Sequence, residues 1–554
     1  MRFRTIRAAA VGLAAAALVL TACSAGPSRP AAPTGGGPLT IGMPNGPQTN
    51  NSNPFLTTSS ARSLGYAYAI YEPLAQVNAV RPGDKPTPWL ASQWSWNPEY
   101  TSLSITARDG VTWSDGKPFT AEDIAYSFQI RKDNKALNAD ALPFGDITTS
   151  GNTVTVTFAS GQFVNQNKVI DDFMVPKHIW STFANPATEL NQQPVGTGPY
   201  TLKSWTPQAV ILTPRQGYWG GQPQVPELRY TSYNDNNALT NALVSGQAQW
   251  GWTFIADFER VYIAPDPANN HFVAPTGLSV DALFLNHEKA PFDNLAVRKA
   301  LNMVINRQDV STLATAGAFE PLTNITGLPE PAGKDFIAAP YVGKGYDVDV
   351  EGAKKVLADA GYTLDGAVLK DPGGAPVEFT LVDPAGWSDY LTTLQLIADA
   401  VKPLGMNAKV ETMTTEAWTN AVNQGNFQAT LHWTNGGSTP WDMYSNMFDG
   451  AQYRAIGESA TWNFGRFRDD ESTKAFETYA TSSDPAARDA ALAALQKTFV
   501  EKVPAIAIIA RPNAAEYSTK NYVGWPSDAD LYSSPQPTGI QASMILMKLR
   551  PAGS

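Results

Sequence analysis

Aromatic and neutral polar side chains are concentrated in one short stretch, residues 431–444. The candidate ligand-binding residues in this stretch are Trp433, Asn435, Gly436, Gly437, Ser438, Thr439, Trp441 and Tyr444. Flat rings pack on the apolar C–H faces of sugars, and neutral donors and acceptors pair with hydroxyl groups without burying a charge. The apolar–polar run 427–432 precedes the stretch, so we expect a loop at a strand end, where binding residues concentrate. This pattern predicts a site for an uncharged oligosaccharide.

Further aromatic candidates lie elsewhere in the chain. The segment 249–254 offers Trp252 and Phe254. Strand alternation places Trp250 on the same face as Trp252, and we choose Trp252 because it lies nearer the predicted strand end. Asn45, in a Pro/Asn/Gly-rich loop, is a candidate hydrogen-bond donor, and Trp387 is a further candidate ring. The alternative for each tryptophan is packing in the core or at its rim.

Enzyme chemistry finds little support in the residue types. Neither Gly-x-Ser-x-Gly nor His-Glu-x-x-His occurs, and the four histidines are scattered without metal-ligand spacing. A single cysteine leaves no intrachain disulfide, CxxC motif or four-cysteine zinc site. Two carboxylates for glycoside hydrolysis remain open among 50 acidic residues, because their separation is a three-dimensional quantity. We predict no catalytic residue, no cofactor and no metal, with a secreted glycan hydrolase as the remote alternative.

Composition indicates a large globular protein. The chain has 554 residues, of which 43% are hydrophobic and 16% charged, so two or three lobes with substantial cores are expected. The formal net charge of -10 argues against a nucleic-acid partner, which requires a concentrated basic face.

The N-terminal residues resemble an export signal. Arg2, Arg4 and Arg7 precede an apolar run over 8–20, which is too short to span a bilayer and typical of a signal peptide. The run ends in Leu-Thr-Ala-Cys at 20–23, which resembles the bacterial lipobox. We therefore predict a signal peptide over 1–22, lipidation of Cys23, a flexible tether over 23–38, and anchoring at the outer face of the cell membrane. An ordinary signal peptide with a chance cysteine is the alternative.

Strand and helix patterns alternate along the rest of the chain. Residues 39–43, 105–107 and 153–158 are predicted strands. Helices are predicted from an N-cap at Thr120 and over 296–305, 350–360, 390–402 and 485–500. Residues 114–116 are expected to form a turn and 196–199 a tight connection. Arg298 and Arg307 are expected to pair with carboxylates.

Eight segments, in order, resemble a known family. They are 71–74 (YEPL), 111–128 (VTWSDGKPFTAEDIAYSF), 194–200 (PVGTGPY), 218–221 (YWGG), 242–246 (ALVSG), 291–293 (PFD), 297–301 (VRKAL) and 360–362 (AGY). Together they resemble family 5 solute-binding proteins, the oligopeptide, dipeptide, nickel and oligosaccharide receptors of ABC importers. The resemblance extends from about residue 39 to the C-terminus.

The resemblance implies an α/β fold, a two-lobed clamp of the periplasmic-binding-protein type (type II, cluster C) with an additional inserted domain. Mapped onto this sequence, lobe I comprises 39–75, 195–282 and 515–554, domain II comprises 76–194, and lobe III comprises 283–514. It also implies a monomer that binds its ligand without chemistry, delivers it to permease subunits, and touches the membrane only through its anchor.

The ligand class implied by the resemblance depends on the loop before Pro440. Peptide receptors of the family hold an acidic residue there that pairs with the peptide ammonium, whereas residues 434–439 here carry no charge. Gly-Gly-Ser-Thr-Pro-Trp at 436–441 instead resembles the segment of cellobiose and β-glucoside receptors. We therefore predict an oligosaccharide ligand of the β-glucan type or a related one, with an oligopeptide as the alternative.

Overall fold

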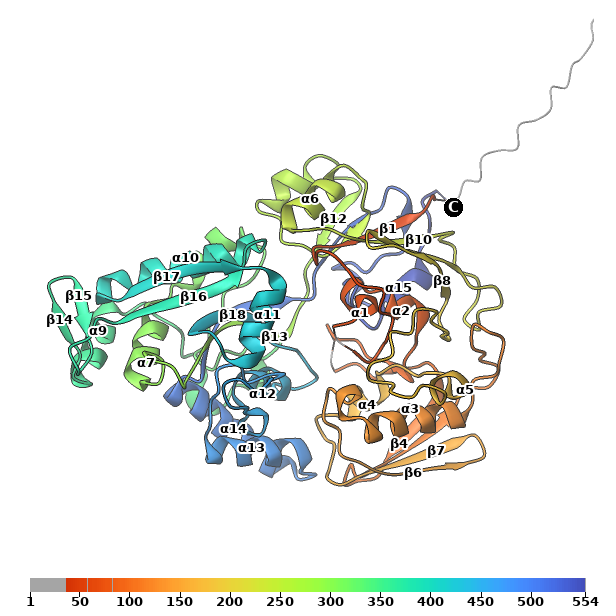
Figure 1. Ribbon diagram of the computed structural model, residues 1–554, viewed down its shortest axis with the longest axis horizontal. Coiled ribbons are helices and arrows are strands. Elements are labelled where there is room, and N and C mark those ends of the chain that lie inside the picture. Colours follow the sequence, from red (N-terminus) through yellow and green to blue (C-terminus); the bar gives the residue numbers. More distant parts are fainter. Residues whose placement is uncertain (1–35, 57, 82, 554) are drawn as a thin grey trace, which may run out of the picture. The chain divides into compact units, whose positions relative to one another are not determined.

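The computed structural model describes residues 36–56, 58–81 and 83–553 (Figure 1). The predicted signal peptide, Cys23 and residues 23–35 of the predicted tether lie outside the described residues. Within the described ranges, no helix is both long and apolar enough to cross a membrane.

Three sheets organise the chain, and the largest has seven strands. Their order is β12 (Asn270–Val273), β20 (Ala515–Ser518), β11 (Trp250–Gly251), β1 (Leu39–Met43), β10 (Leu228–Ser232), β9 (Ala209–Pro214) and β8 (Tyr200–Trp205). Strand β1 is parallel to β10 and β11, and it is buried at four of its five positions because it lies between them. The helices that belong to this part are α1 (Ser60–Leu64), α2 (Ala67–Ile70), α6 (Asn236–Val244) and α15 (Ala542–Lys548).

The second sheet is an antiparallel meander. Its order is β4 (Ala91–Trp96), β5 (Ser102–Ala107), β7 (Thr153–Phe158) and β6 (Phe144–Ser150). Burial alternates along β5 and β7, since one face packs on a core that includes α3 (Ala121–Asp133). Helix α3 begins with the expected cap, because Thr120 and Asp123 form a capping box. The short elements near this sheet are β2 (Ala75–Gln76), β3 (Thr87–Pro88), α4 (Gln166–Ile170) and α5 (Lys177–Trp180).

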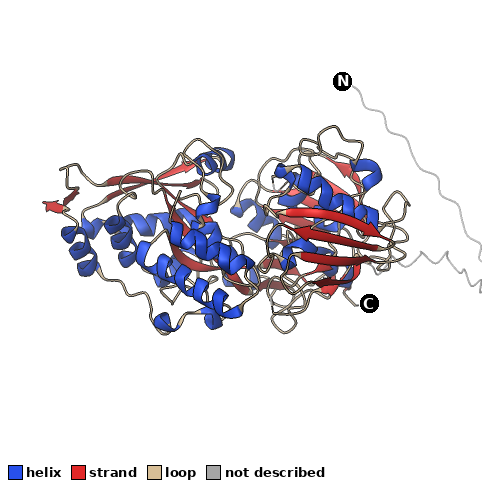
Figure 2. Ribbon diagram, turned by 90° about the horizontal axis from the view of Figure 1, so that it is seen from below, coloured by secondary structure: helices blue, strands red, loops and turns tan. Residues whose placement is uncertain are grey.

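The third sheet has five strands and helices on both faces (Figure 2). Its order is β17 (Asn407–Met413), β16 (Glu378–Pro384), β18 (Ala429–Trp433), β13 (Thr276–Leu285) and β19 (Ala505–Pro512). Alternate residues of β13 enter two different cores, so the strand is apolar on both sides. The first core includes α7 (Leu295–Val304), α9 (Val350–Asp359) and α10 (Ser388–Ala400). The second includes α11 (Thr415–Gln424), α12 (Trp441–Phe448), α13 (Asp470–Thr481) and α14 (Pro485–Lys502).

The remaining elements are short. They are α8 (Arg307–Asp309), the antiparallel pair β14 (Thr363–Asp365) and β15 (Val368–Lys370), and the antiparallel pair β21 (Tyr522–Val523) and β22 (Arg550–Pro551).

The chain passes between the five-stranded and seven-stranded sheets twice, and the two crossings lie side by side. One leads from β12 to β13 and the other from β19 to β20. Thr276 pairs with Pro512, and the Asn513 amide donates to the Pro275 carbonyl at 2.9 Å. The two sheets are therefore connected by a pair of adjacent extended segments, an arrangement suited to a hinge.

Local sequence signals located most of the predicted elements. Strands over 39–43 and 153–158 occur with the predicted bounds, and the four later helices are shifted by at most two residues at either end. The expected ion pairs of Arg298 and Arg307 are wrong. Arg298 donates to the carbonyl groups of Val503, Phe292 and Lys502, and Arg307 donates to that of Ala507. Both guanidinium groups satisfy backbone acceptors at the ends of helices and in a strand.

Candidate functional site

A cavity of about 700 Å³, here called the main cavity, is lined by residues from all three parts of the fold. The region of the seven-stranded sheet contributes Asn45, Arg62 and the segment 252–254. The region of the four-stranded sheet contributes Asp140, Lys168 and Asp171. The region of the five-stranded sheet contributes Ser279, Trp387, the segment 433–436 and Arg511, among others. Because the lining comes from distant parts of the chain, a ligand here would contact all of them.

Seven of the twelve ligand-binding candidates line the main cavity. They are Asn45, Trp252, Phe254, Trp387, Trp433, Asn435 and Gly436. The other five, Gly437, Ser438, Thr439, Trp441 and Tyr444, are not among its lining residues. The structure therefore brings together residues from four separate segments. It divides the stretch 431–444, here called the aromatic loop, after Gly436.

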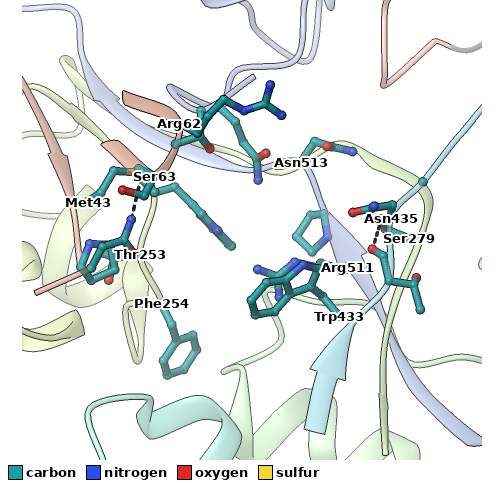
Figure 3. Close-up of a pocket in the computed structure, with 18 of the residues that line it drawn as sticks. Met43, Arg62, Ser63, Thr253, Phe254, Ser279, Trp433, Asn435, Arg511 and Asn513 are labelled. Carbon is teal, nitrogen blue, oxygen red and sulfur yellow. Dashed lines mark hydrogen bonds between the residues drawn. The ribbon is translucent and has the colours of Figure 1, made fainter. Parts of the chain in front are cut away.

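Trp433 ends strand β18 and presents a half-buried ring to the main cavity. Its ring centroid lies 4.1 Å from that of His432 and 6.0 Å from that of Trp387. The Arg511 guanidinium carbon lies 5.2 Å from the same ring centroid, and Figure 3 shows the two side chains together. Neighbours on several sides hold the indole in place, so it can act as a rigid platform.

Trp252 and Phe254 lie beyond the end of β11, and Figure 3 shows Phe254 on the opposite side of the cavity from Asn435. The Trp252 ring stacks on Phe319 with centroids 5.9 Å apart and planes 26° apart. Trp250 is fully buried, and its indole nitrogen donates to the Pro535 carbonyl at 2.8 Å. The difference follows from position, because Trp250 lies within strand β11, whereas Trp252 follows the end of that strand.

Neutral hydrogen-bonding groups surround the rings, and several are already engaged. The Asn45 side-chain amide donates to the Ser63 carbonyl at 2.6 Å. The Asn435 backbone amide donates to the Asn446 side chain at 2.7 Å, and the Ser279 hydroxyl donates to the Thr434 carbonyl at 2.9 Å (Figure 3). These bonds fix the groups in place, and no hydrogen bond from a described residue occupies the Asn435 side-chain amide, which is left for a ligand.

The five candidates outside the cavity build the start of helix α12. A Cβ at Gly437 would lie 2.2 Å from a carboxylate oxygen of Asp442, so a larger residue would displace this carboxylate. The Trp441 indole nitrogen donates to the Phe476 carbonyl at 3.1 Å, and the buried Tyr444 hydroxyl donates to that of Thr326 at 2.7 Å. Helical periodicity turns Trp441 and Tyr444 towards the core of α13 and α14.

Sequence analysis missed the charged lining of the cavity. Arg62, Lys168, Arg511, Asp140, Asp171, Asp389 and Asp442 all line it. They are spread over the chain without a motif, and charged residues are common on any surface. Only Asp442 lies within the aromatic loop, where its place after Pro440 offered a signal that the search for an acid before Pro440 passed over.

Two ion pairs organise much of this charge. Arg511 contacts Asp281 at 2.9 Å, and the Tyr390 hydroxyl donates to the same carboxylate oxygen at 2.9 Å. Burial alone would lower the pKa of Arg511, but Asp281, Tyr390 and Asp389 together outweigh burial and the pKa is raised. Lys168 of α4 pairs with Asp442 of α12; burial would lower the pKa of Lys168, but Asp442 and the nearby Asp140 together raise it. The second pair connects the four-stranded and five-stranded sheet regions across the cavity.

Three acids in the cavity wall, Asp140, Asp171 and Asp389, form no ion pair with any residue that the structure describes. Burial raises the pKa of Asp389 to about 6, with Asp281 adding to the shift and Arg511 opposing it. Burial also raises the pKa of Asp171 well above its usual value, although the Val77 amide donates to it at 3.3 Å. In the part of the chain that the structure describes, no group of three or more His, Cys, Asp or Glu residues is placed to hold a metal ion.

The chain matches known proteins over most of its length. Residues 85–455 match the family model described as bacterial extracellular solute-binding proteins, family 5 middle. The nickel-binding periplasmic protein of Escherichia coli K12 is 26% identical over 333 residues, which is 56% of this chain and 60% of that protein. The glutathione-binding protein GsiB of Salmonella paratyphi A is 25% identical over 334 residues, 58% of this chain and 60% of that protein. This chain therefore covers about three fifths of the length of these curated relatives.

Solved structures share the fold over nearly the whole chain. A periplasmic oligopeptide-binding protein of Thermotoga maritima, crystallised with mannohexaose, superposes with a TM-score of 0.83 at 22% identity, covering 93% of this chain and 99% of that one. The oligopeptide-binding protein AppA of Bacillus subtilis, in complex with a nonapeptide, gives a TM-score of 0.77 at 19% identity, covering 94% and 99%. The predicted α/β fold of two-lobed periplasmic binding proteins is confirmed. With two thirds of its residues matched by the family model, the chain belongs to the family 5 bacterial extracellular solute-binding proteins.

Proposed function

We propose that this protein is the solute-binding component of an ABC importer and that it captures an oligosaccharide in the main cavity. The observation that carries the proposal is the Trp433 ring at the cavity wall, with Trp387 and Trp252 lining the same space. Rings of this kind match the C–H faces of sugars, and the neutral groups of Asn435 and Ser279 match hydroxyls. A structural neighbour crystallised with mannohexaose adds support. A β-glucan-type or related glycan stays our expectation.

In this proposal the ligand works by shifting a conformational equilibrium. It first binds one lobe, and contacts from the second lobe then stabilise the closed state that the permease recognises. The paired crossings at Pro275 and Asn513 provide the hinge, and the predicted division into lobe I, domain II and lobe III is part of the proposal. No step of this cycle breaks or forms a covalent bond in the ligand. The protein acts as a monomer.

An oligopeptide is the second candidate ligand. Three carboxyl groups in the cavity wall, those of Asp140, Asp171 and Asp389, have no ion-pair partner in the described chain and give a peptide ammonium counter-ions away from Pro440. A structural neighbour was solved with a nonapeptide.

A ligand panel separates these possibilities. Purified protein is mixed with cello-, manno- and xylo-oligosaccharides and with tri- to pentapeptides, and both melting temperature and product release are followed. The true ligand class should stabilise the fold by about 2.7 kcal/mol at a hundredfold excess over the dissociation constant. Stabilisation by peptides alone contradicts the sugar proposal, and turnover of any glycan contradicts the transport proposal.

We also propose that Cys23 carries a lipid that anchors the protein to the outer face of the cell membrane. The support is the Leu-Thr-Ala-Cys sequence after an apolar run. Expression in a bacterial host with labelled palmitate should label the native chain and place it in the membrane fraction. The Cys23→Ser chain should be unlabelled and released, and equal labelling of both chains contradicts the anchor.

A further inference from the structure

A second cavity of about 200 Å³, here called the side cavity, adjoins the main cavity. The two share five lining residues: Arg62, Tyr68, Asp140, Lys168 and Asp171. The side cavity adds apolar walls from Phe55, Leu137 and Ile540. Because the shared residues form a common boundary, a substituent of a ligand in the main cavity can extend into this space.

The charges around the side cavity do not cancel. Lys168 is neutralised by Asp442, and Asp172 is neutralised by the buried Arg131 at 2.8 Å. Arg62, Asp140 and Asp171 form no ion pair with any residue that the structure describes. Two carboxyl groups therefore face one guanidinium, so outside these ion pairs the side cavity has one more acidic than basic group.

Arg62 does not call for an anionic ligand. Its guanidinium carbon lies 5.5 Å from the Tyr68 ring centroid and 5.3 Å from that of Phe173, and one nitrogen donates to the Pro54 carbonyl at 3.4 Å. Burial opposes its charge, but Tyr68 and the three neighbouring aspartates raise its pKa. The neighbouring aspartates thus favour a cation in the side cavity, and they would repel an anionic group of a ligand.

Asp171 is the group most in need of a cationic partner. One carboxylate oxygen accepts the long bond from the Val77 amide, and the other has no hydrogen-bond donor among the described residues. Its raised pKa reports the cost of holding the ionised carboxyl in a desolvated place. A cation arriving from the ligand would remove that cost.

The aromatic end of the main cavity has the opposite requirement. Arg511 already lies against the Trp433 ring and is paired with Asp281. A second cation on this ring would meet the Arg511 charge, so a neutral ring suits Trp433 best. The two ends of the combined cavity therefore favour different parts of one ligand.

We propose that the side cavity binds a primary ammonium group of the ligand, with Asp171 and Asp140 as its acceptors. This inference rests on the proposed function, because it assigns a subsite of the same ligand cavity. The ammonium can come from an amino-sugar unit of an oligosaccharide or from the amino group of a peptide. In either case Trp433 receives a neutral portion of the ligand and the side cavity receives the charge.

Matched ligands that differ only at the amino group test the inference. Calorimetry compares the glucosamine tetramer with its fully N-acetylated form, and a tetrapeptide with its N-acetylated form, at a pH where the amines are protonated. We expect the amino form from one of these two sources to bind at least about tenfold tighter than its acetylated partner, in keeping with the strength of a charge-assisted hydrogen bond. Equal affinities within both pairs overturn the inference.

Three variants locate the effect. Asp171→Asn and Asp140→Asn should each reduce the amino-to-acetyl preference, and the double variant should abolish it. Asp146→Asn makes the same charge change at an exposed residue of β6 outside both cavities and should keep the full preference. If Asp171→Asn fails to fold, the exposed Asp140 still provides the test. An unchanged preference in the Asp140→Asn and double variants overturns the assignment.

Failure of this inference can be told from failure of the proposed function. If neutral oligosaccharides bind and the amino form gains nothing, the ammonium subsite is wrong and the sugar receptor stands. If neither sugars nor peptides of either form bind, the proposed ligand cavity itself is wrong, and the subsite is overturned with it.

Discussion

At the scale of single residues, the structure separates two tryptophans that the sequence treats alike. Trp433 lines the main cavity, whereas Trp441 lies behind the wall with its indole nitrogen bonded to Phe476. The Lys168 ammonium nitrogen lies 5.1 Å from the Trp441 ring centroid. Trp441 therefore affects the cavity indirectly, by packing against Lys168, which lines it.

Truncating the two rings should therefore have unequal effects. We expect Trp433→Ala to weaken ligand binding by about 2 kcal/mol, roughly thirtyfold, because a stacking platform is lost. Trp441→Ala should cost less affinity and more thermal stability, since its ring packs against Phe476. Binding is measured by calorimetry with the ligand found in the panel. A larger affinity loss for Trp441→Ala would contradict the assignment of Trp433.

The neighbouring His432 should make the fold sensitive to acid. Burial lowers the pKa of His432 to about 3, although its ring nitrogen donates to the Trp433 carbonyl at 2.8 Å. An unfolded histidine titrates near pH 6.5, so the unfolded chain binds more protons between those two values. The free energy of unfolding therefore falls as the pH falls below 6.5. From pH 6.5 to pH 5 the loss from this residue is about 2 kcal/mol.

The variant His432→Gln should lack this part of the acid response. Urea unfolding at pH 7 and pH 5 gives the stability change for both chains. The native protein should lose about 2 kcal/mol more than the variant, whatever the variant's stability at pH 7. An identical change in both chains would show that His432 is not held neutral.

At the scale of elements, helix α12 explains why the aromatic loop is divided. Pro440 precedes the helix, and the turn at Gly437 lies close to Asp442 in the first helical turn. Once the chain becomes helical, its rings point to the core that α12 shares with α13 and α14. The predicted aromatic and neutral residues of the segment therefore line the cavity only up to Gly436, and beyond it Asp442 does so.

The tight connection at 196–199 is a second element whose residue types are required by packing. A Cβ at Gly196 would lie 1.9 Å from the Ile70 carbonyl oxygen at the end of α2, and the Gly198 amide donates to that oxygen at 2.8 Å. No side chain fits between these backbone segments.

Gly196→Ala should therefore destabilise the protein by about 3 kcal/mol, because backbone atoms must move apart. Chemical unfolding measures the loss. Gly83→Ala is the matched control, since a Cβ there meets no atom within 4 Å, and it should leave stability unchanged. Equal stability of the two variants would contradict the close approach at Ile70.

At the scale of the whole molecule, several contacts connect the parts of the described chain around the cavity. The paired crossings join the seven-stranded and five-stranded sheets, and Arg511 lies just before one of them, bound to Asp281 on the other strand. The Lys168–Asp442 pair joins α4 to α12. Nearby, Phe163 packs edge-on against Tyr479 with centroids 6.2 Å apart.

If these contacts hold the ligand-bound state together, removing the Lys168–Asp442 pair should weaken binding. Lys168→Met and Asp442→Asn should each reduce affinity, because the first leaves the Asp442 carboxylate without its ion-pair partner and the second leaves the Lys168 ammonium without its own. The double variant should cost less than the sum of the two, with a coupling of about 2 kcal/mol.

Lys203→Met serves as the control for this cycle. It breaks a pair with Glu227 at 3.0 Å that lies on the seven-stranded sheet region and outside the cavity, and it should not change affinity. Additive losses in the double variant would show that the Lys168–Asp442 pair plays no part in ligand capture.

The sequence by itself determined the local structure and the family. Strand β1, the capping box at Thr120 and the proline-started helix α14 were all predicted from near neighbours in the chain, because propensity and capping act over a few residues. Turn glycines and the ordered motifs were recognisable for the same reason. Trp433 and Trp252 were also predicted as ligand-binding residues from their residue type and from the position of each near a predicted strand end.

Only the tertiary structure decided which residues share the cavity and what charge it carries. Arg62, Lys168 and Asp442 come from three distant segments, and Asp171 lacks an ion-pair partner in the described chain only because of how those segments meet. Arg298 and Arg307 show the same limit, since the carbonyl groups of Val503 and Ala507, far along the chain, took the place of the expected carboxylates. Burial and ion pairing depend on neighbours in space, and linear spacing carries no record of them.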